Sequence, residues 1–167
     1  MDFRIISKSL PEALPQLEAL DRVAMPEDMW LSEEERDILQ AATDGLAVLI
    51  MEGENIIAGG YALPAKDVED FLQEVDSKFA AQDEEAYIYS VAVAPNARRK
   101  LLGTILRIRL VFELREKGFK IACSHIKMSN DWHVAGQKTY DPTETRIVSG
   151  YWPGSEYPDV EFQRFNL

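Results

Sequence analysis

Residues 86–126 read AYIYSVAVAPNARRKLLGTILRIRLVFELREKGFKIACSHI, and this stretch decides the fold. Residues 86–93 are rich in β-branched and aromatic side chains, which favour a β-strand, and Pro95 ends it. A long helix is predicted over residues 98–117, and residues 121–126 form a second strand. A strand, a helix and a strand in this order predict two parallel strands that lie side by side in one sheet.

The sequence on both sides of this unit predicts further helices and antiparallel strands. They are a strand over residues 2–8, a helix over 9–22, a helix from Ser32 to about Gly45, a hairpin of strands 46–51 and 56–63, a helix over 67–80, a short helix near 132–139 and two final strands near 146–152 and 160–165. Together the elements predict an α/β (α+β) fold in a single domain over residues 1–167. Its centre is a mixed, twisted sheet of about seven strands with helices on both faces.

Three helix starts carry recognisable signals. The stretches SLPE (residues 9–12) and SEEE (residues 32–35) have the form of a capping box, in which the Ser and Glu side chains each accept a hydrogen bond from the other residue's backbone N–H. Asp67 is the expected N-cap of a third helix, in which apolar residues recur at helical spacing as far as Phe79.

Composition excludes several classes of protein. Of the 167 residues, 46% are hydrophobic and 28% are charged, as in an ordinary globular domain and unlike a disordered or fibrous chain. The longest unbroken apolar run, residues 46–51, is far shorter than the ~20 residues of a membrane-spanning helix. The first residues lack the apolar segment of a signal peptide, so we expect a cytoplasmic protein. Cys123 is the only cysteine, so we expect no intramolecular disulfide, and no spacing of His, Asp and Glu predicts a metal site.

The net charge of −11 is unevenly distributed. Residues 1–97 carry 6 Lys and Arg against 21 Asp and Glu, whereas residues 98–120 carry 8 against 2. A basic segment in an acidic chain predicts a site for one anionic ligand and leaves an acidic surface for a cationic partner. Charged helix faces that simply contact water are the alternative explanation.

The turn between the strand and the long helix combines features that bind phosphate. Arg98, Arg99 and Lys100 supply positive charge directly before the helix. The first N–H groups of a helix have no partner within it, and the helix dipole is positive at this end. Gly103 allows a ligand to approach the backbone closely. Basic residues at a helix start are common, so these features alone leave the question of a phosphate site open.

Residues 91–104 resemble the signature of the GNAT superfamily, the Gcn5-related N-acyltransferases. That signature is a strand ending V-x-V-x-P, followed by a turn that reads Gln/Arg-x-x-Gly-x-Gly/Ala and binds the pyrophosphate of acyl-coenzyme A. The matching residues are Val91, Val93, Pro95, Arg98 and Gly103. Leu101 stands where the first glycine is expected. Because a leucine can hold a helical backbone, we expect the fold to be kept and the side chain to crowd a phosphate.

The resemblance extends along nearly the whole chain and implies the fold described above, with the helix over 67–80 as an insertion. It implies acyl-CoA, and acetyl-CoA in particular, as the co-substrate. The pantetheine arm is then expected to pair with strand backbone where the two parallel strands splay apart. The cofactor-binding residues that the resemblance implies are Val91, Val93, Arg98, Arg99, Lys100, Leu101, Leu102, Gly103, Thr104 and Asn130.

The reaction that the resemblance implies is attack of an amine on the thioester carbonyl. An alkylamine with a pKa of ~10.4 is neutral in only about one molecule in 2,500 at pH 7, so a base or a desolvating pocket must help. Many family members use a glutamate on the fourth strand; the aligned residue here is Tyr87, and Glu85 lies two positions earlier. A tyrosine that often protonates the leaving thiolate is replaced by Gln137. Tyr140, about one turn later, is the candidate proton donor or else a packing residue.

The acceptor site that the resemblance implies lies between two walls. Trp30, next to Met29, occupies the region of one wall, and Tyr151 and Trp152 lie on the final hairpin, which forms the other. Aromatic rings suit a cationic amine, although core packing or a dimer contact explains them equally well. His125 either lines the cleft or packs in the core.

Three functions are therefore open. The first is an N-acyltransferase, and more narrowly an N-acetyltransferase, that moves an acyl group from acyl-CoA to a primary amine of a small molecule or a protein. The acidic first part of the chain favours a cationic acceptor. The second is a catalytically silent module that binds acyl-CoA as a sensor or assembly factor. The third, an acidic mimic of nucleic acid, conflicts with the basic segment. We expect no nucleic-acid or membrane partner and allow for a homodimer.

Overall fold

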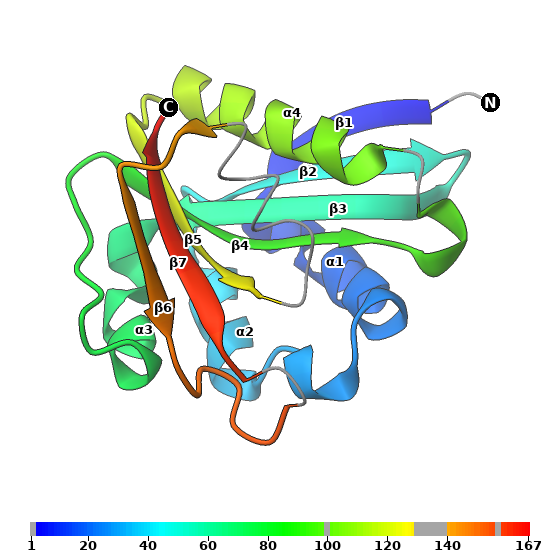
Figure 1. Cartoon of the computed structure of the whole chain (residues 1–167). Helices are drawn as coiled ribbons and strands as arrows, with labels where there is room; N and C mark the ends of the chain where they lie inside the picture. The colour runs from blue at the N-terminus through cyan, green and yellow to red at the C-terminus, as the bar shows by residue number, and fades with distance from the viewer. Residues whose placement is uncertain (1–2, 99–100, 129–139, 156–157) are drawn as a thin grey trace.

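The computed structural model describes residues 3–98, 101–128, 140–155 and 158–167 (Figure 1). Its helices and strands are β1 (Phe3–Ser9), α1 (Leu10–Ala24), α2 (Glu33–Ala41), β2 (Leu46–Glu52), β3 (Asn55–Pro64), α3 (Glu69–Val75), β4 (Glu85–Val93), α4 (Leu102–Glu116), β5 (Ile121–Lys127), β6 (Glu144–Val148) and β7 (Val160–Asn166). Short 3-10 turns lie at Glu27–Met29, Ala65–Val68 and Pro95–Ala97. Within these ranges no helix is both long and apolar enough to cross a lipid bilayer.

The strands form one 7-stranded sheet in the order β1-β2-β3-β4-β5-β7-β6. Neighbouring strands are antiparallel except β4 and β5, which are parallel, as the strand–helix–strand unit predicts. In the described residues, β4 and β5 pair only over Glu85–Tyr87 and Ile121–Cys123 and then diverge. The prediction of a mixed sheet of this size is confirmed.

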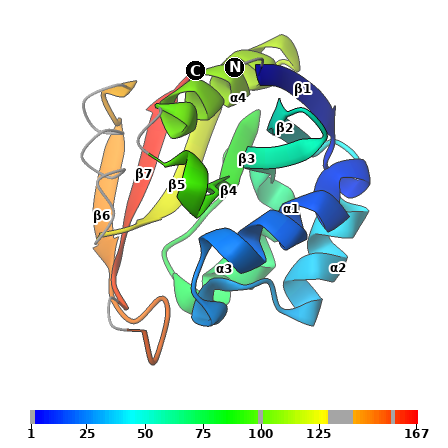
Figure 2. The same cartoon turned by 90° about the vertical axis from the view of Figure 1, so that its right-hand side faces the viewer.

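Helices cover both faces of the sheet, as predicted (Figure 1, Figure 2). On one face lies α4, whose Leu106, Leu110 and Leu114 are fully buried against the sheet. On the other face lie α1, α2 and α3, and α1 buries Leu14 and Leu17 there. Leucines three or four residues apart fall on one side of a helix, so the sheet is enclosed between two hydrophobic layers.

The two predicted capping boxes differ in outcome. At α2 the box is present: the Glu35 N–H donates to Ser32 Oγ (3.1 Å), and the Ser32 N–H donates to the Glu35 carboxylate (2.8 Å). At α1 Ser9 is the N-cap residue, as predicted, but the predicted box is wrong because the Ser9 side chain makes no capping hydrogen bond. The first N–H of α1, that of Leu10, instead donates to the carbonyl of Gly45 (3.0 Å).

The third predicted helix, with Asp67 as its N-cap, is shorter than expected. Asp67 lies within a 3-10 turn, and α3 follows this turn and ends at Val75. Phe79 lies beyond the helix and is buried edge-on against Tyr87 and Phe162, with ring centroids 6.0 and 5.9 Å away. A turn of the chain, rather than a continuous helical stripe, therefore brings Phe79 into the core.

Other boundaries also differ from the predictions. Leu102 is the first residue of α4, which starts later than predicted. Val148 ends β6, so Tyr151 and Trp152 lie in the loop before β7 rather than in a strand. The short helix predicted near residues 132–139 lies outside the described residues.

Candidate functional site

A cavity of about 160 Å³ lies where β4 and β5 diverge. The register of β3 against β4 slips between Ser90 and Ile88, which leaves Tyr89 as an extra residue in β4. A bulge of this kind bends its strand and increases its twist, which accounts for the way β4 turns away from β5. The cavity therefore occupies the space that two parallel strands leave between them.

Residues from both faces of the sheet line the cavity. Val91 and Ser124 line it on the α4 face, together with Arg107 of α4 itself. Tyr87 and His125 line it on the opposite face, which α1, α2 and α3 cover. The cavity thus connects the two sides of the sheet.

Aromatic side chains form a continuous wall on the α1 face of the cavity. Each ring contacts the next, with centroids 4.8 to 5.7 Å apart. The series that we call the aromatic wall is Tyr61, Tyr89, Tyr87, His125, Tyr151 and Trp152. The wall begins on β3, crosses β4 and β5 and ends in the loop between β6 and β7, so segments far apart in the sequence build one surface.

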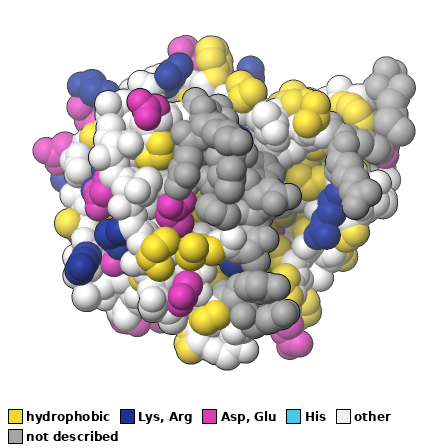
Figure 3. All heavy atoms as spheres, in the orientation of Figure 1, with side chains coloured by type: hydrophobic (Ala, Val, Ile, Leu, Met, Phe, Trp, Pro, Cys, Tyr) yellow, Lys and Arg dark blue, Asp and Glu magenta, His cyan; other side chains and the backbone are white. Residues whose placement is uncertain are grey.

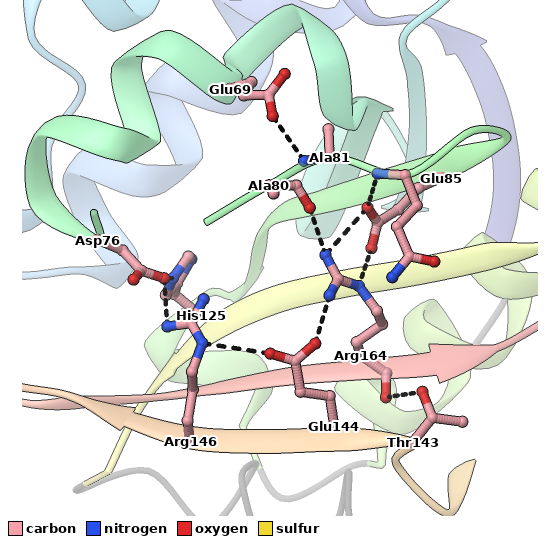
Figure 4. Close-up of polar contacts among 11 residues, drawn as sticks. Glu69, Asp76, Ala80, Ala81, Glu85, His125, Thr143, Glu144, Arg146 and Arg164 are labelled. Atoms are coloured by element: carbon pink, nitrogen blue, oxygen red, sulfur yellow. Dashed lines mark hydrogen bonds and ion pairs between the residues drawn. The ribbon is translucent and has the colours of Figure 1, made fainter. Parts of the chain in front are cut away.

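A chain of hydrogen bonds runs from the aromatic wall into the protein, and Figure 4 shows its inner part at His125, Asp76 and Arg146. The hydroxyl of Tyr87 lies 2.8 Å from Nδ1 of His125, and Nε2 of His125 lies 2.9 Å from Oδ2 of Asp76. Arg146 forms an ion pair with the same oxygen (2.5 Å). Because an ionised carboxylate can only accept, Nε2 carries the proton and Nδ1 accepts from Tyr87.

Burial and pairing set the protonation states along this chain. Burial lowers the pKa of His125 against the opposing effect of Asp76, so the ring is neutral at pH 7. Burial acts to raise the pKa of Asp76, but the bonds from His125 and Arg146 outweigh it and keep this pKa below its usual value. Burial raises the pKa of Tyr87 well above its usual value, so the hydroxyl keeps its proton. His125 is therefore neutral, and its Nδ1 carries no proton.

Two carboxylates reach the cavity from the helices on the α1 face. Asp21 is buried beside the Tyr61 hydroxyl (3.4 Å), and burial raises the pKa of Asp21 to about 7. Glu35 accepts a hydrogen bond from the Tyr89 hydroxyl (2.5 Å) in addition to its capping bond with Ser32. The sequence pattern indicated Glu35 only as a cap and marked no role for Asp21, because helical spacing does not show which polar side chain turns toward the sheet.

Two of the predicted catalytic residues, Tyr87 and Glu85, lie in different environments. Tyr87 lines the cavity, but Glu85 does not. Glu85 is buried beside β7, where Arg164 Nε donates to one carboxylate oxygen (2.6 Å) and the Gln82 N–H donates to the other (2.7 Å) (Figure 4). Glu85 is the first residue of β4, and its carboxylate is the counter-ion of Arg164.

Tyr140, the third predicted catalytic residue, lies on the α4 side. Its ring stacks on Phe165 with 4.7 Å between centroids, and the guanidinium of Arg107 lies 4.9 Å from the ring centre. Burial raises the pKa of Tyr140. The ring does not line the cavity itself but contacts Arg107, which does.

The predicted cofactor-binding residues follow β4 and the start of α4. Val91 lines the cavity, and Val93 packs against the same hydrophobic layer. At the start of α4, Leu102 and Gly103 are buried and Thr104 is exposed. The N–H groups of these three residues have no partner within the helix, as at any helix start.

Leu101 has an unexpected backbone conformation. Its φ of 58° and ψ of 11° lie in the left-handed region, and its side chain is 75% exposed. The expectation that this leucine continues the helix is therefore wrong. Glycine adopts this conformation without steric cost, which is a physical reason for glycine at this position of the signature.

Arg98 joins the turn before α4 to the end of α1. Its Nη2 donates a hydrogen bond to the carbonyl of Ala24 (2.8 Å). Arg99, Lys100 and Asn130, which complete the predicted cofactor site, lie outside the described residues.

The predicted acceptor residues divide into two groups. Tyr151 and Trp152 line the cavity, whereas Trp30 does not. The Trp30 indole N–H donates to the carbonyl of Met25 (3.2 Å), and the guanidinium of Arg22 lies 5.5 Å from the ring centre. Trp30 does not line the cavity itself, but its neighbours Met29 and Leu31 do, so a role of Trp30 in acceptor binding stays a prediction.

Charged side chains outside the cavity are mixed in sign. On the face drawn in Figure 3, acidic and basic side chains are interspersed among hydrophobic and uncharged ones. Among the side chains drawn there, the acidic excess of the chain does not gather in one patch. Within the residues that the structure describes, no group of three or more His, Cys, Asp or Glu side chains could hold a metal ion.

The sequence matches the model of one known protein family. The match covers residues 14–135, and the family is described as the acetyltransferase (GNAT) family. A comparison with curated protein sequences finds no significant match.

Solved acetyltransferase structures share the fold. The ribosomal-protein-S18-alanine N-acetyltransferase of Escherichia coli has a TM-score of 0.68 and 17% identity, over 98% of this chain and 94% of that one. Arabidopsis thaliana Naa50, in complex with the bisubstrate analogue CoA-Ac-MVNAL, has a TM-score of 0.68 and 13% identity, over 98% and 99%. The PaiA N-acetyltransferase of Thermoplasma acidophilum, in complex with coenzyme A, has a TM-score of 0.60 and 12% identity, over 100% of both chains. At these identities the likeness shows the fold.

Proposed function

This chain belongs to the GNAT family of acetyltransferases, and from that premise we propose that it is an N-acyltransferase, which moves the acyl group of an acyl-coenzyme A to a primary amine. The observation that carries the proposal is the cavity between β4 and β5, which is lined from both faces of the sheet. A donor and an acceptor that approach from opposite faces meet there. The amine nitrogen forms a bond to the thioester carbonyl carbon, the C–S bond breaks, and the coenzyme A thiolate takes up a proton.

The donor binds on the α4 face in this proposal. The backbone of β4 near Val91 and Val93, where no pairing with β5 is present in the described residues, would pair with the pantetheine arm. The first turn of α4, over Leu102–Thr104, would bind the pyrophosphate with its N–H groups and the positive end of the helix dipole. Arg98 fixes this turn against α1, and the two basic residues that follow it add positive charge.

The acceptor binds on the α1 face in this proposal. A primary amine is an ammonium ion in water, and aromatic rings attract a cation that lies over their faces. The aromatic wall provides such rings, and the carboxylates of Asp21 and Glu35 lie in the same cavity. We therefore propose a cationic acceptor, which is either a small molecule or an amino group of a protein.

Tyr87 and His125 remove the proton from the attacking amine in this proposal. Tyr87 takes a proton from the amine nitrogen while its own hydroxyl proton passes to Nδ1 of His125. His125 becomes positively charged, and the carboxylate of Asp76 stabilises that charge through Nε2. Glu85 takes no part in this proton path because its carboxylate forms an ion pair with Arg164.

Tyr140 remains the proposed proton donor to the leaving thiolate. Its hydroxyl is protonated at neutral pH, as in any tyrosine, and burial raises its pKa further. Its ring contacts Arg107, which lines the cavity. The role requires the hydroxyl to reach the donor's sulfur when the donor is bound.

Release of free thiol from acyl-CoA in the presence of primary amines tests the proposed activity. A panel of polyamines, aminoglycosides and lysine peptides covers the expected acceptors. We expect thiol release that depends on both the acyl-CoA and an amine. Tyr87→Phe should lower kcat by about 10²-fold or more, because it removes the proton path. The same variant should keep the wild-type Kd for coenzyme A in calorimetry, because the ring remains.

A sensor that binds acyl-CoA without turnover is the second candidate function. Tyr87 in place of the family's glutamate and the exposed side chain of Leu101 at the phosphate turn favour it. This candidate predicts heat of acyl-CoA binding but no thiol release with any amine. Absence of binding would exclude both functions.

A further inference from the structure

Arg107 is a buried cation that has no anionic partner among the described residues. It projects from α4 and lines the cavity, the residue is only 7% exposed, and Nη2 has no hydrogen-bond partner in the described part of the chain. The guanidinium lies 4.9 Å from the ring centre of Tyr140 and 5.8 Å from that of Phe165. Burial lowers the pKa of Arg107, but a guanidinium remains charged in proteins. The rings carry no charge, so the described residues offer this guanidinium no counter-ion.

Arg164 shows how a buried guanidinium is normally accommodated in this chain. It is 8% exposed, almost as little as Arg107, and it pairs with the carboxylates of both Glu85 and Glu144. Burial of a charge without a partner is unfavourable, so an unpaired buried charge in a cavity is a candidate for ligand binding. Among the described residues Arg107 has no counter-ion, and a bound ligand that carries an anionic group can supply it.

Arg107 lies more than one turn along α4 from the helix start, with its guanidinium over the rings of Tyr140 and Phe165. It follows Leu102 by five positions, which corresponds to about 7.5 Å along the helix axis. The guanidinium lies where β4 and β5 diverge, and Ile88 and Ser124 line the cavity with it. In the proposed function, the acyl group of the donor occupies this place.

We propose that Arg107 binds a carboxylate at the far end of the donor's acyl group, so that the donor is the coenzyme A thioester of a short dicarboxylic acid. This inference rests on the proposed function. A planar guanidinium presents two parallel N–H donors that match a carboxylate, and the Ser124 hydroxyl lies in the same cavity. An acetyl group is uncharged and leaves Arg107 unpaired, whereas a dicarboxylic acyl group supplies its counter-ion.

The bonds that form and break are the same as for any acyl group. The amine nitrogen bonds to the thioester carbon, its proton leaves through Tyr87, and coenzyme A departs as the thiol. The distal carboxylate takes no part in the reaction and stays on the product. A cationic amine thus becomes an amide that carries a negative charge.

Succinyl-CoA and butyryl-CoA test the inference, because their acyl chains have the same length and differ only by a carboxylate in place of a methyl group. Calorimetry measures the Kd of each thioester without an acceptor. We expect the wild type to bind succinyl-CoA at least about tenfold more tightly than butyryl-CoA. Arg107→Gln should abolish this difference by weakening the binding of succinyl-CoA alone.

Arg107→Leu adds a measurement that does not depend on turnover. Because this substitution removes an unpaired buried charge, the variant should melt no lower than the wild type and should prefer butyryl-CoA. Equal Kd values for the two thioesters in the wild type would overturn the inference and leave the proposed function intact. An equal loss for both thioesters in Arg107→Gln would also overturn it, because the guanidinium would then act on a group that both share. Failure of every thioester to bind would overturn both proposals.

Discussion

His125 connects two residues that lie far apart in the sequence, Tyr87 on β4 and Asp76 at the end of α3. Asp76 accepts a hydrogen bond from Nε2 of His125 and thereby selects the tautomer in which Nε2 carries the proton. In this tautomer Nδ1 can accept a proton. Asp76 also acts to raise the pKa of His125, whereas burial lowers it. Asp76 therefore influences the pH range over which His125 can take a proton.

Asp76→Asn should change the pH dependence of the reaction. Loss of the negative charge lets the pKa of His125 fall further and removes the stabilisation of the imidazolium. Activity is lost as the pH falls through the pKa of His125, so the acidic limb of the kcat profile should move to lower pH. We also expect kcat to fall by about tenfold or more.

Steady-state rates across the pH range measure both effects, with a thermal melt as the control for folding. If the variant folds and the acidic limb of its kcat profile lies at the same pH as in the wild type, Asp76 does not belong to the proton path.

Asp21 gives the folded protein a second dependence on pH. Burial raises its pKa from 3.8 to about 7, so between these values the folded protein holds a proton that the unfolded chain has lost. The free energy of unfolding therefore falls as the pH rises through this window, by on the order of 4 kcal/mol for the full shift. The side chain of Asp21→Asn cannot ionise. The Tm of this variant, relative to the Tm of the wild type, should therefore increase as the pH rises from about 5 to about 8. A constant difference in Tm would show that Asp21 does not titrate in this window.

The sequence predicted some residues of the site and missed others for a common reason. Tyr87 and Tyr151 were predicted for the site and line the cavity, because position along a strand or hairpin can be read from the sequence. The ion pair of Glu85 was not predicted because its partner, Arg164, comes from β7, far away in the chain. Asp76 was missed because its role depends on the end of a helix that was predicted to continue.

Among the elements, the start of α4 departs most clearly from the family signature. A left-handed conformation costs a residue with a side chain roughly 1–2 kcal/mol, and Leu101 adopts it. Leu101→Gly should raise the free energy of unfolding by up to about 1 kcal/mol, since glycine loses part of this gain to the greater freedom of the unfolded chain. The same variant should bind coenzyme A more tightly, because it removes an exposed side chain from the turn that we propose binds the pyrophosphate.

Leu101→Ala is the matched control, because it shortens the side chain but keeps the backbone strain. We expect it to tighten binding in calorimetry without the gain in stability that denaturant unfolding measures for Leu101→Gly. Weaker coenzyme A binding by both variants would contradict a phosphate site at this turn.

Local sequence signals predicted individual helices and strands well. They did not predict features that depend on contacts between distant parts of the chain. The capping box of α2 is confirmed because all of its contacts lie within four consecutive residues. The parallel pair β4–β5 is confirmed because a crossover helix leaves few alternatives. The bulge at Tyr89 was not predicted, since no glycine or proline marks it, and it is the bulge that bends β4 away from β5.

At the scale of the whole molecule, the sheet separates two chemical environments. The α4 face combines helix N–H groups that have no partner within α4 with a buried guanidinium, and the α1 face combines the aromatic wall with two carboxylates. The cavity between β4 and β5 joins them, which suits a transfer from an anionic donor to a cationic acceptor. The resemblance to the GNAT superfamily is confirmed by the family match. A single domain over residues 1–167 and a homodimer stay predictions.

A crystal structure with a bound, unreactive acyl-CoA analogue tests the central claim most directly. We predict the pyrophosphate at the first turn of α4 and the acyl carbon in the cavity between β4 and β5, beside Tyr87. Coenzyme A bound on another surface, or a first turn of α4 that the chain itself covers while no analogue binds, would contradict it.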